Sequence, residues 1–240
     1  MKNDRRRAPK GGRPRPAKTQ KPAQKPAQKR TPRPAAQPAP PADQTPRRFR
    51  LGVIPGATPG KWVDAWKERM PHVGMDVVPI TVAGQRAALD DLDAALVRLP
   101  LDDRDALHVI PLYDEVPVVV APIDSFLMAT DSLTADDLTG QVLITPGDDV
   151  LGPLDLPTQT PSFPTIETTK DSVATVASGV GILIVPMSLA RLHHRRDVDY
   201  RPLLGGRAST VALAWLRDAT TPDVETFVGI VRGRTANSSR

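Results

Sequence analysis

The stretch VASGVGILIVP, residues 176–186, decides the fold. Its apolar run Ile182-Leu183-Ile184-Val185 predicts a strand that is buried on both faces of a sheet. Gly179 lies just past residues 170–178, whose pattern predicts a helix with Thr169 at its N-cap. A helix that leads through a glycine turn into a fully buried strand is typical of α/β proteins.

The chain before this stretch repeats the same alternation. The pattern predicts strands over residues 49–54, 75–82, 94–99, 107–112 and 116–122, with helices over residues 60–70 and 84–92 between the first three. A new start at residues 141–145, with another predicted strand over 162–166, indicates a second lobe. A strand over 210–216 and a helix over 223–231 close the chain. We therefore expect a two-lobed α/β protein with mostly parallel sheets.

The composition separates the first 48 residues from the rest. Residues 1–48 hold 15 Lys and Arg against 2 Asp and Glu, and 11 of the 27 prolines, whereas the remaining chain carries more acidic than basic residues. Such a segment buries too little apolar surface to offset its ordering entropy, so we expect a disordered tail. Residues 234–240 are expected to be disordered as well.

The cations of the tail suit contacts with phosphate chains, because each contact releases counterions. Residues 12–16, Gly-Arg-Pro-Arg-Pro, partly resemble an AT-hook, although Gly11 stands where an arginine is expected. Non-specific DNA or RNA binding would use the following residues: Arg5, Arg6, Arg7, Arg13, Arg15, Lys21, Lys25, Lys29 and Arg30. A merely solubilising tail is the alternative.

Several classes of protein are disfavoured. The chain has no cysteine, which excludes disulfides and thiolate metal sites, and no apolar run long enough for a membrane span. Without a secretory pattern at its start, the cytoplasm is expected. Residues 56–61 lack the P-loop spacing, and residues 193–196, His-His-Arg-Arg, are interpreted as a solvated helix end. No nucleophile–base pair and no metal cluster is evident, so we expect neither an enzyme nor a cofactor.

The order of these segments resembles the effector-binding domain of LysR-type transcriptional regulators, a fold similar to that of periplasmic binding proteins. Residues 50–56, RLGVIPG, resemble the opening strand and turn of the family, and residues 92–97, LDAALV, resemble a later strand. Residues 133–138, LTADDL, resemble the short helix before the second lobe. The most specific match is VASGVGILIVP, at residues 176–186.

The resemblance implies a domain over residues 49–233. Lobe I would take about 49–122 and 205–233, and lobe II about 123–204. The usual N-terminal winged helix-turn-helix has no counterpart in residues 1–48, so the domain is expected without its DNA-reading module. The turn at residues 123–127 also departs from the pattern of the family.

The resemblance further implies a cleft between the lobes, where helix N-termini favour a small organic anion. The contact residues it implies are Ala57, Thr58, Pro59, Gly60, Ala83, Gly84, Gln85, Thr145, Gly147, Thr168 and Thr169. Thr58 and Thr169 have a simpler alternative role as helix caps.

Partners follow from the same resemblance. A homodimer is expected, with Trp62, Val63 and Trp66 forming an apolar face on the first helix. Burial of this face in the core of the same chain is the alternative. Two other functions stay open, which are nucleic-acid association through the tail and a role as heterodimer partner of complete LysR regulators.

Overall fold

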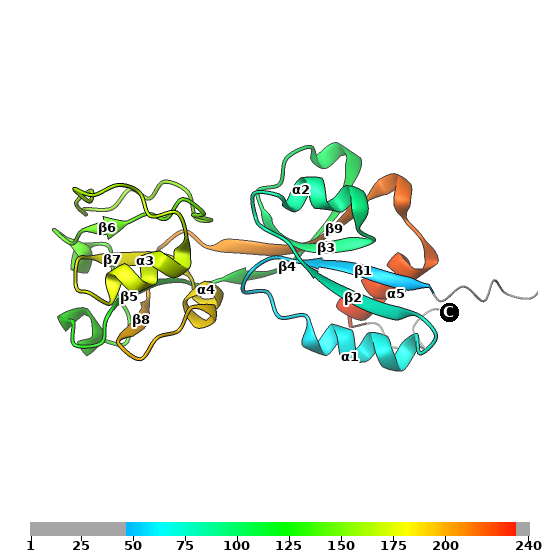
Figure 1. Ribbon diagram of the computed structural model, residues 1–240, viewed down its shortest axis with the longest axis horizontal. Coiled ribbons are helices and arrows are strands. Elements are labelled where there is room, and N and C mark those ends of the chain that lie inside the picture. The colour runs from blue at the N-terminus through cyan, green and yellow to red at the C-terminus, as the bar shows by residue number, and fades with distance from the viewer. Residues whose placement is uncertain (1–46, 234–240) are drawn as a thin grey trace, which may run out of the picture. The chain divides into compact units, whose positions relative to one another are not determined.

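The computed structural model describes residues 47–233 (Figure 1). The predicted basic tail, including all nine of its proposed nucleic-acid contacts, lies outside the described residues apart from its last two positions. The predicted C-terminal segment, residues 234–240, lies outside them too. Within residues 47–233, no helix has both the length and the apolar character needed to cross a membrane.

Lobe I is built on a five-stranded sheet with the strand order β2-β1-β3-β9-β4 (Figure 1). The strands are β1 (Arg48–Val53), β2 (Gly74–Pro79), β3 (Ala94–Leu99), β4 (Leu107–Glu115) and β9 (Ser209–Leu216). β1 runs parallel to β2 and β3, whereas β9 runs antiparallel to β3 and β4. The carboxyl ends of β1, β2 and β3 therefore meet at one edge of this sheet.

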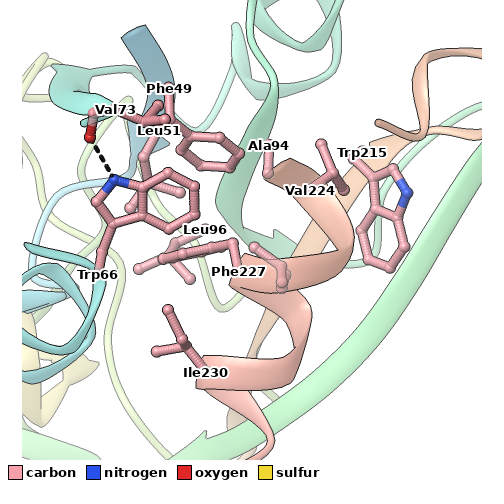
Figure 2. Close-up of a cluster of buried hydrophobic side chains, with 11 residues drawn as sticks. Phe49, Leu51, Trp66, Val73, Ala94, Leu96, Trp215, Val224, Phe227 and Ile230 are labelled. Carbon is pink, nitrogen blue, oxygen red and sulfur yellow. Dashed lines mark hydrogen bonds between the residues drawn. The ribbon is translucent and has the colours of Figure 1, made fainter. Parts of the chain in front are cut away.

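The core of lobe I joins that sheet to α1 (Gly60–Arg69) and α5 (Pro222–Val231). The rings of Phe49, Trp66 and Phe227 pack on one another, with centroids 4.7 to 6.0 Å apart. Figure 2 shows Trp66 pointing into this cluster, where its Nε1 donates a hydrogen bond to the carbonyl of Val73 at 2.9 Å. Trp66 has no exposed surface, so it belongs to the core rather than to an exposed dimer face.

Lobe II is built on a four-stranded sheet with the order β6-β7-β5-β8. The strands are β5 (Pro117–Pro122), β6 (Leu143–Ile144), β7 (Ile182–Pro186) and β8 (Val198–Pro202), and the helices are α3 (Thr169–Val176) and α4 (Met187–Leu192). Every residue of β7 is buried. Leu183 and Val185 pack into one core cluster, while Ile182 and Ile184 pack into another, as a strand covered on both faces requires.

Short helices complete the described chain. α2 (Gln85–Ala88) has four residues, and it continues into the first of five 3₁₀ turns. These turns are η1 (Leu89–Asp91), η2 (Arg104–Ala106), η3 (Phe126–Ala129), η4 (Asp136–Leu138) and η5 (Arg217–Ala219). The helix predicted over residues 84–92 is therefore this shorter and tighter pair of elements.

The two-lobed α/β fold class is confirmed, with corrections to its details. The sheets are mixed rather than mostly parallel, because β5 and β9 run antiparallel to both of their neighbours. β5 belongs to the sheet of lobe II, so lobe II begins before residue 123. The predicted strand over residues 162–166 is a loop, in which Pro161 and Pro164 cannot donate to a ladder. The sequence pattern missed β8, an edge strand with polar residues between its apolar ones.

Candidate functional site

A cavity of about 700 Å³ lies where residues of the two lobes face each other. Lobe I contributes the segments that follow β1 and β2, together with the carboxyl-terminal half of β3. Lobe II contributes the turn after β6, the start of α3 and the end of α4. Its lining residues are Pro55, Thr81, Val82, Ala83, Arg98, Gly147, Asp148, Asp149, Val150, Thr168, Thr169, Lys170, Leu189, Leu192 and His193. The edge where parallel strands end is the usual place for a ligand in α/β proteins.

Arg98 is the charged residue in the lobe I wall, and its charge is already neutralised. The side chain is buried, and its Nε donates to Glu115 Oε2 at 2.9 Å while Nη2 donates to Oε1 at 3.2 Å. Nη1 donates to the carbonyl of Pro55, and Nη2 also donates to Ser188 Oγ in lobe II. Ser209 Oγ donates to the same carboxylate at 3.2 Å. Burial of a charge is tolerable only with such a full set of partners.

Two further contacts fix this wall. The side-chain amide of Gln85 donates from Nε2 to the carbonyl of Arg98 at 2.9 Å and accepts from its backbone N–H at 2.8 Å. Gly56 has a φ of 85°, and a Cβ there would lie 2.6 Å from Ser188 Oγ. The turn after β1 therefore approaches α4 too closely for any side chain at this position.

The lobe II wall centres on the first turn of α3. Thr168 is the N-cap, because its Oγ1 accepts from the backbone N–H of Asp171 at 3.1 Å. Thr169 begins the helix and is 2% exposed. Its backbone N–H and its hydroxyl both donate to Asp148 Oδ1, at 2.7 and 2.8 Å. A carboxylate of the chain itself thus occupies the positive end of the helix.

The remaining charged groups of this wall differ in their surroundings. Asp149 Oδ1 accepts from the backbone N–H of Leu151 at 3.0 Å, and Lys170 makes no ion pair with any of residues 47–233. Burial lowers the pKa of His193, with nearby Lys170 adding to the shift and Asp148 opposing it. His193 is therefore a half-buried, neutral side chain of the cavity at neutral pH, rather than part of a solvated helix end.

The structure brings some of the sequence-predicted contact residues to this cavity and leaves others away from it. Ala83, Gly147, Thr168 and Thr169 line it. The predicted residues outside the lining are Ala57, Thr58, Pro59, Gly60, Gly84, Gln85 and Thr145. Gln85 holds the backbone of β3, and Gly84 donates its N–H to Thr81 Oγ1 at 3.0 Å. Thr58 does not cap α1, whose N-cap is Pro59.

Thr145 instead lines a second cavity of about 570 Å³. This cavity lies under the loop between β6 and α3, and Pro153, Leu156, Phe163 and Ile166 contribute to its walls. It belongs to lobe II alone. Within residues 47–233, no group of three or more His, Asp or Glu side chains could hold a metal ion.

Sequence reasoning missed the residues that carry the charge of the main cavity. Arg98 had a usable signal, since a charged residue inside the apolar run of a central strand must find a buried partner. Asp148 and Lys170 stand one position from predicted contacts. Leu189 and Leu192 had no signal beyond helical periodicity, because nothing local shows which face of α4 meets lobe I.

The strand topology and the site define a two-lobed α/β domain with a cavity between its lobes. The family model described as the LysR substrate binding domain matches residues 42–236, and the chain belongs to this family. Members are effector-binding regulatory domains that act in transcription regulation and are not enzymes.

Similar proteins agree with this assignment. The chain is 25% identical over 210 residues to the Hca operon transcriptional activator HcaR of Escherichia coli strain K12, covering 81% of this chain and 70% of that protein. The BenM effector-binding domain with its effector benzoate has the same fold, with a TM-score of 0.63, 18% identity, and coverage of 79% of this chain and 95% of that one. The reduced OxyR regulatory domain from Pseudomonas aeruginosa matches with a TM-score of 0.60 and 23% identity, over 79% of this chain and 96% of that one.

Proposed function

We propose that this protein is a transcription-regulatory sensor that binds a small organic anion in the cavity between its lobes. The observation that carries the proposal is the position of the cavity, at the carboxyl ends of parallel strands of both lobes and at the start of α3. The start of α3 suits a carboxylate, since it already holds that of Asp148. Lys170, which makes no ion pair with any of residues 47–233, adds a cation at the same wall.

The rest of the lining sets the kind of anion. Val82, Ala83, Leu189 and Leu192 make much of the surface apolar. Such a wall favours a ligand that joins a carboxylate to an apolar body. BenM, which shares the fold, has benzoate as its effector, a ligand of this type.

The test is a thermal-shift screen of the full chain against aromatic acids, aliphatic acids, amino acids and uncharged analogues. A ligand that binds only the folded state at about 100 times its Kd should raise Tm by about 5 °C or more. Ala83→Phe should abolish the shift, because Ala83 is an exposed residue of the cavity wall. Ala87→Phe is the matched control, since Ala87 is also exposed and lies in α2 outside the lining. A hit that survives Ala83→Phe would place binding elsewhere and refute the proposal.

The proposal includes a homodimer and a cytoplasmic location, as expected of a regulator that acts on the chromosome. The dimer surface would exclude Trp66, which is fully buried. Light scattering of the full chain tests the mass directly, and a monomer at micromolar concentration would contradict this part.

A second candidate function rests on the charge of residues 1–48, with 15 basic against 2 acidic residues. Non-specific DNA or RNA binding through this segment would fall steeply with salt and vanish on deletion of residues 1–46. Full-length protein that fails to bind a DNA duplex at low salt would eliminate this candidate.

A further inference from the structure

The contact between Asp148 and α3 closes the position where an effector carboxylate would bind. One oxygen of Asp148 accepts both the backbone N–H and the hydroxyl of Thr169, at 2.7 and 2.8 Å. These two donors are the polar groups that the first residue of α3 offers to the cavity. Two residues further along the turn, the N–H of Asp171 is taken by the Thr168 cap.

The opposite wall offers no substitute. The guanidinium of Arg98 is held by Glu115, by the Pro55 carbonyl and by Ser188 of lobe II, and the carboxylate of Glu115 neutralises its charge. Among the lining side chains, Asp148 and Asp149 balance Arg98 and Lys170, and the buried Glu115 behind Arg98 adds a further negative charge. A ligand anion therefore meets no excess of positive charge in this arrangement.

We propose that Asp148 is an intramolecular competitor of the effector and decides how strongly the cavity binds carboxylates. A ligand carboxylate binds at Thr169 only when the Asp148 side chain has left it, because the same two donors cannot serve both anions and like charges repel. Asp148 is an exposed residue, so its carboxylate can turn into water and no charge is left buried without a partner. The apparent affinity for an acid is then reduced by the fraction of molecules in which Thr169 is free.

This inference rests on the proposed function and assigns a specificity-determining residue to the same site. A comparison with Asp149 separates the occupation of the Thr169 donors by Asp148 from the effect of its negative charge. Asp149 lies beside Asp148 and lines the same cavity, but its carboxylate accepts from the N–H of Leu151 instead. Substitution of either residue removes one negative charge from the cavity. Only the loss of Asp148 frees Thr169.

The experiment is titration of benzoate into the full chain by calorimetry, with Asp148→Ala and the matched control Asp149→Ala. Asp148→Ala should bind benzoate about tenfold more tightly than the unmodified chain, which is the scale of one charge-assisted hydrogen bond. Asp149→Ala should stay within about twofold. Asp148→Asn, which keeps the shape and an acceptor, should show a smaller gain, and it replaces Asp148→Ala if that variant fails to fold.

Three results would overturn the inference. They are equal benzoate affinity of the Asp148 variants and the unmodified chain, an equal gain for Asp149→Ala, and an absence of benzoate binding by folded Asp148 variants. After any of these three results, the cavity would still be supported as the effector site by an uncharged or cationic ligand from the thermal-shift screen whose binding is lost in Ala83→Phe. Benzoate binding to Asp148→Ala that survives an added Ala83→Phe would instead refute the proposed function.

Discussion

Two polar groups face the same cavity, and they differ in how they are held. The Arg98 group of lobe I, made of Arg98, Glu115 and Gln85, is buried, and both Glu115 and Gln85 form hydrogen bonds with Arg98. The Asp148 group of lobe II, made of Asp148, Thr169 and Lys170, has an exposed carboxylate and an exposed lysine around one buried threonine. The first wall is fixed by its own bonds, whereas the second can exchange partners without leaving a charge buried. We therefore propose that ligand recognition belongs to the second.

The largest expected effect comes from a substitution that disrupts the Arg98 group. Glu115→Gln leaves the buried guanidinium of Arg98 without a counter-charge, and this should lower the free energy of unfolding by about 3–5 kcal/mol. Urea denaturation of the full chain measures the change. The control is Asp76→Asn, which breaks the exposed ion pair with Arg48 and should have little effect. Similar stability of the two variants would show that the Arg98 group is not the rigid element described here.

The second expected effect concerns the N-cap of α3, which the sequence pattern placed at Thr169 and the structure places at Thr168. Thr168→Ala removes the N-cap of α3 and should cost about 1 kcal/mol. Thr58→Ala is the matched control, because the side chain of Thr58 makes no cap bond to α1. Unfolding curves of both variants are compared, and an equal loss in each would contradict the assignment of the cap to Thr168.

The smallest expected effect concerns pH. Burial lowers the pKa of His193 in the folded state, so the unfolded chain takes up this proton first as the pH falls. The stability that neutral His193 contributes is complete above the ordinary pKa of about 6.5 and is lost as the pH falls through the lower folded pKa. His193→Gln should therefore make the decline in stability between pH 7 and 5 shallower. His194→Gln is the control, since His194 is an exposed residue, and an equal change in both variants would contradict the assignment.

The sequence predicted the fold more completely than the site. Strong apolar runs such as Ala94–Leu99 and residues 182–185 have one stable environment, a central strand, and both became central strands. Four of the predicted loop contacts, Ala83, Gly147, Thr168 and Thr169, line the cavity, and their contact with a ligand stays a prediction. These residues lie in turns close to strand ends, and local sequence patterns indicate strand ends well.

The rest of the site depends on contacts between distant segments. Gln85 follows a strand end as a ligand contact would, yet its amide binds Arg98, thirteen residues away. Asp148 meets Thr169 across a 21-residue separation. The intervening loop packs around its own cavity, and no periodic pattern indicates where it returns. A single sequence does not specify such pairings, because turn chemistry constrains only neighbouring residues.

The most direct test maps the bound state of the strongest thermal-shift hit by amide NMR of the full chain. We expect large shift changes at Ala83, Gly147 and Thr169 and little change in the side-chain signals of Arg98 and Gln85, because the lobe II wall adapts to the ligand and the lobe I wall does not. Changes confined to residues 153–166 would place the ligand in the loop cavity of lobe II. That result would contradict the assignment of the effector site to the cavity between the lobes.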